Sequence, residues 1–204
     1  MRINTSRKIF SIIGLMLVCN QVVCASDIDF LVEICEDCHG KDGYSDQPDI
    51  PIIAGFSQKG FINTMAVFRA NERVALAFSK PGEPESLMND IAQDLSDEEV
   101  VDLAKHFSKL PFHAADQSAD AELAKIGEIL HIEKCERCHK QNGAEPVEDA
   151  AILAGQWTQY LRRQFTNLQS GKRTVPESMS RKVEGLSAQD IEALLNFYAM
   201  EGSD

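Results

Sequence analysis

Two short patterns of cysteine and histidine are the residues of this 204-residue chain best suited to chemistry. They are Cys35-Glu36-Asp37-Cys38-His39 and Cys135-Glu136-Arg137-Cys138-His139. Residues at i, i+3 and i+4 share one face of a helical turn, so the two thiols and the imidazole of each pattern point the same way. Two such thiols can add to the two vinyl groups of one porphyrin, and the histidine can bind its iron. The patterns therefore predict covalent attachment of a c-type haem in each copy.

Three other chemistries of paired cysteines fit these patterns less well. A zinc site built from the four cysteines leaves the two histidines unexplained. A redox-active dithiol needs neither histidine nor duplication, and a disulfide inside either pattern would be strained. We therefore predict two haem c groups, with Cys35, Cys38, Cys135 and Cys138 as attachment points and His39 and His139 as axial ligands.

Two methionines occupy equivalent places and are the candidates for the sixth iron ligand. Met88 lies seven residues before Leu95, and Met179 lies seven residues before Leu186. A thioether opposite histidine raises the reduction potential and closes the iron to other ligands. Met65 sits in an apolar helical stretch, which favours core packing. We predict Met88 and Met179 as ligands, and replacement of Met88 by Met65 stays open at this point.

The first 25 residues have the features of an export signal. Three cations within the first eight residues precede an apolar run at 9–18, and Ala25 closes a plausible cleavage site. The run is too short to span a bilayer, so we expect a periplasmic protein without a membrane span after cleavage. Cleavage removes three cations and no acidic residue, which changes the net charge from −12 to −15. This acidity argues against nucleic-acid binding, because phosphates require Lys and Arg.

The chain is an internal repeat. An offset of 100 residues aligns the two haem patterns and also Ile52–Gly55 with Ile152–Gly155. Further along, an offset of 91 aligns Leu95–Glu99 with Leu186–Asp190, so the first half carries nine more residues. We place these extra residues in the Pro/Gly-rich loop Ser79–Pro84.

Each half is predicted to be helical. Apolar spacing predicts helices over 27–38, 58–71 and 157–170. Ser96 with Glu99, and Ser187 with Asp190, form capping patterns for the last helix of each half. No alternating strand pattern is present, so we expect an all-α fold of two tandem haem domains. The predicted division is a signal peptide over 1–25, an N-terminal domain over 26–110, a linker over 111–120 and a C-terminal domain over 121–204.

With a haem pattern, an Ala-Gly turn, a methionine and a final helix opened by Leu-Ser in each half, the mature chain resembles the class I diheme cytochromes c of the c4 type. Its second half is similar, over 130–139 and 152–161, to the cytochrome subunit of flavocytochrome c, the sulfide dehydrogenase. The first half is similar around Met88–Ala92. The resemblance implies two tandem class I cytochrome c domains, His/Met ligation of both haems, and a flavoprotein partner that oxidises sulfide and passes electrons to the haems.

One departure from the c4 pattern concerns the turn after each haem motif. That type often has a proline just before the turn, as at Pro51, but the second half has Ala151. We therefore expect the carbonyl that orients His139 to come from another residue. In contrast, Gly171-Lys172-Arg173 is similar to the free electron carriers of the c4 type.

Several conspicuous side chains lie outside the haem motifs. We expect His106, His113 and His131 at the surface or at helix ends, because the repeat does not match them in pairs. Trp157 and Tyr160 are expected around the second haem or at the domain interface. Haem propionates or a solvated helix face remain equal alternatives for the guanidinium groups of Arg162, Arg163 and Arg173.

These features predict electron transfer, with no catalytic residue assigned. The chain is expected to be the electron-accepting haem subunit of an oxidoreductase that includes a flavoprotein, and to pass electrons on to a downstream redox protein. The alternative is a free diheme carrier that delivers electrons to a terminal oxidase. A peroxidase, a thiosulfate-oxidising haem enzyme or a gas sensor would each require an open iron.

Overall fold

The computed structural model describes residues 28–79, 82 and 84–201. The predicted signal peptide and part of the predicted Ser79–Pro84 loop lie outside these residues. The described part forms eight α-helices and two short 3-10 helices, and none of its residues belongs to a β-strand. None of the described helices has the length and apolar character needed to cross a membrane.

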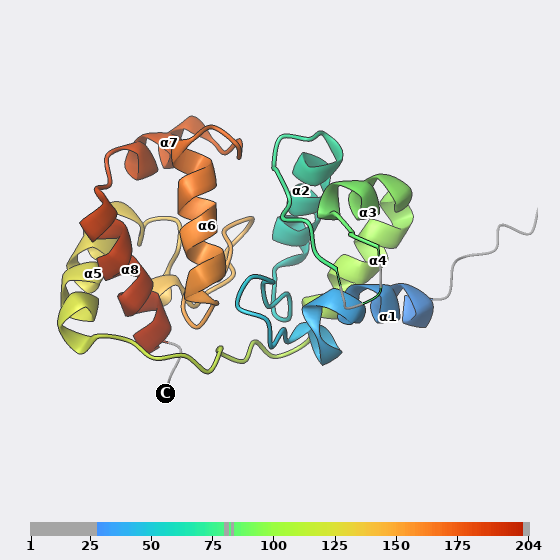
Figure 1. Cartoon of the computed structure of the whole chain (residues 1–204), viewed down its shortest axis with the longest axis horizontal. Helices are drawn as coiled ribbons and strands as arrows, with labels where there is room; N and C mark the ends of the chain where they lie inside the picture. Colours follow the sequence, from blue (N-terminus) through green and yellow to red (C-terminus); the bar gives the residue numbers. More distant parts are fainter. Residues whose placement is uncertain (1–27, 80–81, 83, 202–204) are drawn as a thin grey trace, which may run out of the picture.

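The helices form two groups, drawn blue to green and yellow to red in Figure 1. The first group contains α1 (Ile28–His39), η1 (Lys41–Gly43), α2 (Gln58–Arg69), α3 (Met88–Asp94) and α4 (Asp97–Phe107). The second contains α5 (Ala121–Lys134), η2 (Gln141–Gly143), α6 (Thr158–Gln169), α7 (Glu177–Glu184) and α8 (Ala188–Glu201). Residues 111–120 connect the groups as an extended segment without helix (Figure 1).

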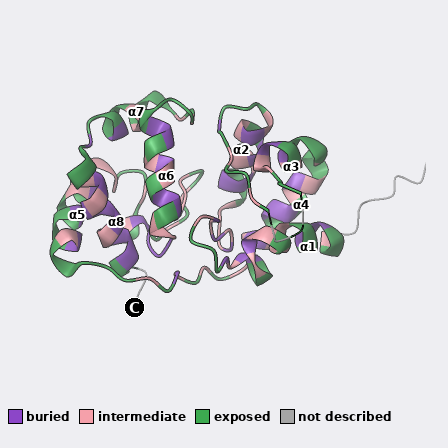
Figure 2. Cartoon of the chain, in the orientation of Figure 1, coloured by how far each residue is buried: buried purple, intermediate pink, exposed green. Residues whose placement is uncertain are grey.

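The two groups share one packing scheme. In the first, α4 packs against α1 and α2, and α2 also packs against α3. In the second, α8 packs against α5 and α6, and α6 also packs against α7. The buried faces of these helices meet inside each group (Figure 2), so each half has its own apolar core. This repetition confirms the predicted fold of two tandem all-α domains.

The helices that the sequence predicts are present with small shifts at their ends, but three further helices, α3, α5 and α7, were not predicted. Helices α1, α2 and α6 begin and end within two residues of their predicted bounds. Helices α3 and α7 are short, and they contain Met88 and Met179 respectively. Both capping patterns form, since Ser96 and Ser187 each exchange hydrogen bonds with the residue three positions later.

The two haem motifs differ in local structure. Helix α1 continues through His39, whereas α5 ends at Lys134, before the second motif. The backbone N–H groups of Cys135 and Glu136 both donate to the carbonyl of His131, at 2.7 and 2.9 Å. Because one carbonyl accepts from both N–H groups, the regular α-helical pattern of hydrogen bonds ends at this point. The motif then continues as a turn in which the N–H of His139 donates to the carbonyl of Cys135 at 2.9 Å.

Helix α5 lies very close to α8. Its buried face carries Ala124, Gly127 and His131 at helical spacing. A Cβ atom at Gly127 would stand 2.1 Å from the carbonyl oxygen of Ala193. Only glycine therefore permits this approach, which brings the side chain of His131 beside Phe197.

Polar contacts join the two halves. The side chain of Gln156 accepts from the N–H of Ile52 at 3.0 Å and donates to its carbonyl at 2.9 Å, and both residues are buried. The indole N–H of Trp157 donates to the carbonyl of Ser45 at 2.9 Å. Trp157 and Gln156 thus belong to the domain interface, one of the two places expected for Trp157.

Candidate functional site

The imidazole of His39 is held in one orientation at the end of α1. Its Nδ1 lies 2.7 Å from the carbonyl oxygen of Pro51, and the side chain is buried. Burial lowers the pKa of His39, although the hydrogen bond to Pro51 acts in the opposite direction. The ring is therefore neutral at pH 7, with Nδ1–H donating to the carbonyl. This leaves the lone pair of Nε2 available to a metal, and a fixed orientation is what metal-bound histidines require.

His139 has the same arrangement in the second half. Its Nδ1 lies 3.0 Å from the carbonyl oxygen of Ala151. The expectation that another residue would orient His139 was therefore wrong, because the acceptor is a backbone carbonyl and alanine supplies it as well as proline does. Burial lowers the pKa of His139, although the hydrogen bond to Ala151 acts in the opposite direction.

The four motif cysteines are available for thioether bonds. Within the described residues none of them takes part in a disulfide. Burial raises the pKa of Cys35 to about 12 and also raises that of Cys135. Thiols protonated at neutral pH are poor ligands for zinc. No group of three or more His, Cys, Asp or Glu side chains in the described part of the chain is placed to hold a metal ion.

The methionines fall into two classes. Met88 begins α3 and packs, half-buried, against the first core, while Met179 is half-buried in α7. Met65 is buried inside α2 as part of the core, the place that a packing role requires. Met200 is 43% exposed at the end of α8. Met88 and Met179 thus occupy equivalent helices, and their ligation of iron remains a prediction.

The guanidinium groups of Arg162 and Arg163 have carboxylate partners. Arg162 forms an ion pair with Glu192 on α8. Arg163 forms one with Asp49, which connects the two halves. Neither is therefore available to a haem propionate without giving up its partner. The sequence did not decide whether Arg162, Arg163 and Arg173 face a haem propionate or solvent. Of these three, Arg173 alone has no carboxylate partner in the described part of the protein.

Arg173 is joined by Arg73, which sequence reasoning missed. The two residues pair as an isolated antiparallel bridge between the halves, and they are related by the 100-residue offset of the repeat. That offset is the signal that could have identified Arg73. Its guanidinium donates to the hydroxyl of Tyr160 at 2.5 Å and to Gln164 at 3.1 Å, and Arg173 donates to the same Gln164 oxygen at 3.0 Å.

This arginine pair is suited to bind anions. Burial and, to a smaller extent, the charge of Arg73 lower the pKa of Arg173 to about 10. Burial also acts to raise the pKa of Tyr160, but the positive charges of Arg73 and Arg173 outweigh it and leave that pKa lowered. Arg73 is buried and Arg173 is half-buried, and two such adjacent cations without a described carboxylate partner require a counter-charge. Haem propionates are such anions, so the residues at the interface fit the cofactor that the two motifs predict.

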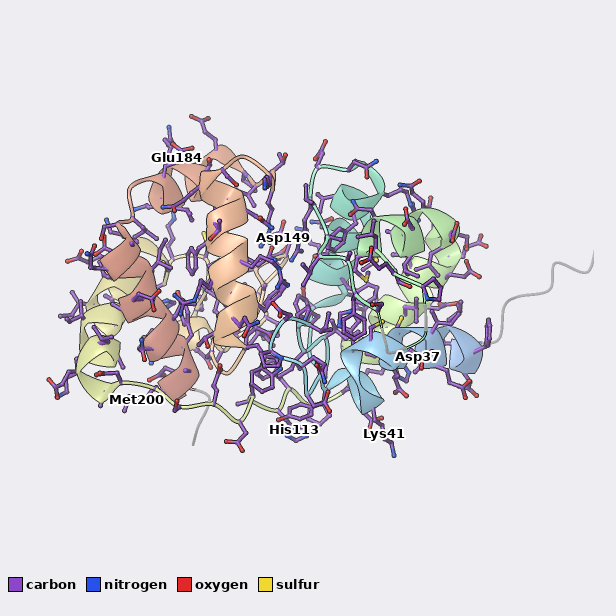
Figure 3. All side chains as sticks on the ribbon, viewed as in Figure 1. Asp37, Lys41, His113, Asp149, Glu184 and Met200 are labelled. Atoms are coloured by element: carbon purple, nitrogen blue, oxygen red, sulfur yellow. The ribbon has the colours of Figure 1, made fainter. Side chains whose placement is uncertain are left out.

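The histidines outside the motifs differ from one another. His113 is exposed on the linker, below the two halves in Figure 3, with its ring 6.2 Å from that of Tyr44. His106 is half-buried in α4, and its Nε2 has no partner among the described residues. His131 lies in the last turn of α5, the helix-end place that was one of its two expected places, but it is 0% exposed and therefore not at the surface.

Comparison with known proteins identifies the family. No protein-family model matches the chain. Cytochrome c4 of Azotobacter vinelandii is 32% identical over 187 residues, which cover 80% of this chain and 82% of that protein. The crystal structure of reduced recombinant cytochrome c4 from Pseudomonas stutzeri has a TM-score of 0.68 at 29% identity, over 84% of this chain and 95% of that one.

A thiosulfate dehydrogenase (TsdBA) from Marichromatium purpuratum shares the fold, with a TM-score of 0.64 at 24% identity, but this chain covers only 36% of it. The two cytochromes c4, in contrast, match both halves of the chain, together with the linker between them. Two haem c groups follow from this relationship. The chain belongs to the cytochrome c4 family and is a diheme c-type cytochrome that carries electrons.

Proposed function

We propose that the protein works in the periplasm as the haem subunit of a sulfide-oxidising complex and accepts electrons from a flavoprotein. In this proposal His39 and Met88 ligate one iron, and His139 and Met179 ligate the other. When bound, each haem c supplies a one-electron Fe(III)/Fe(II) couple. The observation that carries the proposal is the same histidine–carbonyl hydrogen bond in both halves, each with a methionine in the equivalent short helix.

The residues around each site favour electron transfer over chemistry at the iron. A histidine fixed through Nδ1 and a methionine from a separate helix would occupy both axial positions. The arginine pair would hold propionate charge between the two halves. A haem enzyme or gas sensor needs an open axial position, and the predicted ligands leave none.

Substitution of single methionines tests the ligand assignment. Oxidised His/Met haem shows a sulfur-to-iron charge-transfer band at the red end of the visible spectrum. Met88→Ala and Met179→Ala should each remove about half of its intensity, because each removes one of two thioether ligands. Met65→Leu is the matched control and should keep the full band. If Met65→Leu lost about half of the band and Met88→Ala kept all of it, Met65 rather than Met88 would be the ligand.

The exposed face of α5 supports a subunit rather than a free carrier. It displays three isoleucines spaced three residues apart: Ile126 is 52% exposed, Ile129 59% and Ile132 58%. The helix thus buries small or polar side chains and exposes its largest apolar ones. Such a stripe on a soluble acidic protein indicates a surface that a partner covers. Helix α5 leads directly into Cys135, so a flavoprotein bound there would lie near the second haem.

A free diheme carrier that delivers electrons to a terminal oxidase is the second candidate. The observation in its favour is that the curated relatives with the longest matches are cytochromes c4. The two candidates differ in whether a flavoprotein stays bound through purification. Both candidates are compatible with the domain bounds that we propose, an N-terminal domain over 26–110 and a C-terminal domain over 121–204.

Copurification from the native cell distinguishes these candidates. The subunit proposal predicts that the protein elutes with a flavin-containing chain and that Ile129→Glu releases it. Phe30→Glu is the matched control, because Phe30 is 60% exposed on α1 in the other half; this variant should retain the flavoprotein. Elution without flavin in all three forms would support the free carrier.

A further inference from the structure

Helix α1 exposes an apolar row that ends at the first haem motif. Phe30 is 60% exposed and Ile34 is 38% exposed. They lie eight and four positions before Cys38, so the three residues share one face of the helix. Large apolar side chains exposed on an acidic chain indicate a surface that another molecule covers. Because Cys38 is a predicted attachment point, a molecule on this row would lie beside the first haem.

The same helix carries only negative charge. It contains four carboxylates and neither lysine nor arginine. Glu33 and Asp37 are exposed and lie three positions after Phe30 and Ile34, so they flank the apolar row; Asp37 is labelled in Figure 3. A face of this kind is complementary to a partner face that is apolar at its centre and has Lys or Arg at its rim.

The second half differs at the equivalent positions. An offset of 100 matches Ile34 with Lys134 and Asp37 with Arg137, so cations replace an apolar residue and a carboxylate. The net charge of residues 28–39 is −4, whereas that of residues 128–139 is −1. A basic partner is therefore attracted more strongly to the first haem motif than to the second.

A second copy of this chain is a poor occupant of the α1 face. A twofold contact between two α1 helices would bring their carboxylates together, and each chain has a net charge of −12 even before the predicted cleavage. The isoleucine row of α5, proposed above as the flavoprotein surface, lies toward the opposite end of the molecule (Figure 1). A partner on α5 would therefore leave α1 accessible to another protein.

We propose that the α1 face around Phe30, Glu33, Ile34 and Asp37 docks the downstream electron acceptor, a redox protein with an apolar docking face rimmed by Lys and Arg. In the docked complex the acceptor gains one electron and the first haem iron changes from Fe(II) to Fe(III), with no bond formed or broken. The inference deepens the proposed function by naming the surface from which electrons leave. It rests on the proposed attachment of the first haem, and it does not depend on which donor binds α5.

Charge reversal at matched positions of the two halves tests this surface. Glu33→Lys and Glu133→Lys change the net charge by the same amount, and both side chains are exposed. The probe is tris(1,10-phenanthroline)cobalt(III), a one-electron oxidant that combines positive charge with an apolar aromatic surface. In stopped-flow oxidation of the fully reduced protein at low ionic strength, Glu33→Lys should slow the reaction about fivefold and Glu133→Lys less than about twofold.

The apolar part of the surface is tested by substitutions that leave the charge unchanged. Phe30→Ser should slow the reaction with the cobalt complex about threefold, because it removes apolar contact area. Ile129→Ser on α5 is the matched control, since Ile129 is 59% exposed and Phe30 is 60% exposed. This control should react at the rate of the unmodified protein.

Hexacyanoferrate(III), an anionic oxidant, separates docking from a change in reduction potential. Glu33→Lys should speed the reaction with this anion while it slows the reaction with the cobalt cation. A changed potential of the first haem would instead alter both rates in the same direction.

Three results would overturn the proposal. They are equal effects of Glu33→Lys and Glu133→Lys on the cobalt reaction, equal effects of Phe30→Ser and Ile129→Ser, and slowing of both oxidants by Glu33→Lys. Absence of haem from a Cys135→Ala/Cys138→Ala variant would refute attachment at the first motif, and the α1 surface with it. Failure to copurify with a flavoprotein would refute only the proposed donor, so the two failures are distinguishable.

Discussion

At the scale of single residues, the histidines of the two haem motifs show that a backbone carbonyl fixes the orientation of each ring. Pro51 and Ala151 differ in side chain, yet each accepts a hydrogen bond from the Nδ1 of a histidine twelve residues earlier. Sequence reasoning overvalued the proline because it treated a frequent residue type as the source of the contact. What proline adds at such a position is a fixed φ angle, and the acceptor is common to every residue.

Ala151→Pro should therefore stabilise the protein without disturbing the haem. The change restricts the unfolded chain, and the equivalent Pro51 shows that the backbone here is compatible with proline, so we expect a gain of about 0.5 kcal/mol. The matched control is Ala150→Pro, which loses the hydrogen bond from its N–H to the carbonyl of Val147 and should destabilise. Thermal unfolding followed by circular dichroism measures both. A changed haem spectrum in Ala151→Pro would contradict the role given to the carbonyl.

His131 marks the limit of pattern reading at a single position. Without a matching histidine in the first half, a place at the surface or at a helix end was the simplest prediction. Its repeat partner Leu31 is apolar, however, and that position faces the core in both halves. Equivalence by position, rather than by residue type, was the signal that predicts burial.

At the scale of elements, five of the eight described helices were predicted, and α3, α5 and α7 were not. The Ser96–Glu99 and Ser187–Asp190 patterns correctly located the final helices, because a capping box satisfies backbone donors locally. Helices α3 and α7 have seven and eight residues, too few for a periodic pattern to stand out. The early end of α5 depends on the backbone carbonyl of His131, which no side-chain pattern reports.

The cap of α4 gives a quantitative prediction. Ser96→Ala removes the acceptor for the N–H of Glu99, at 3.2 Å, and should lower the free energy of unfolding by about 1 kcal/mol. Ser118→Ala, an exposed serine in the linker, should change it by less than about 0.5 kcal/mol. Denaturant titration measures the free energy of unfolding of both variants. Equal values for Ser96→Ala and Ser118→Ala would contradict the capping role of Ser96.

At the scale of the whole molecule, duplication was predictable and the interface was not. The repeat offset, the linker and the two apolar cores all follow from local patterns. The contacts that join the halves connect residues about 100 positions apart, such as Ile52 with Gln156 and Arg73 with Tyr160. Gln156 and Arg73 resemble ordinary surface residues in the sequence, and only the packing of one half on the other buries them.

Gln156→Ala should weaken this interface. It leaves the buried N–H and carbonyl of Ile52 without partners, which should cost about 2 kcal/mol or more in the free energy of unfolding. Gln159→Ala is the matched control, because that side chain makes an exposed contact with Asp49 and its loss should cost less than about 0.5 kcal/mol. Similar stability of the two variants would show that the reciprocal Gln156 contacts do not hold the halves together.

Carbon monoxide binding to the fully reduced protein at neutral pH tests most directly that this diheme cytochrome carries electrons through closed haems. In the proposed ligation, His39 and Met88 bind one iron and His139 and Met179 bind the other, which would leave neither iron with an open position. The account predicts no change in the visible spectrum on addition of carbon monoxide. Stoichiometric binding at either haem would contradict it and would indicate a haem that performs chemistry.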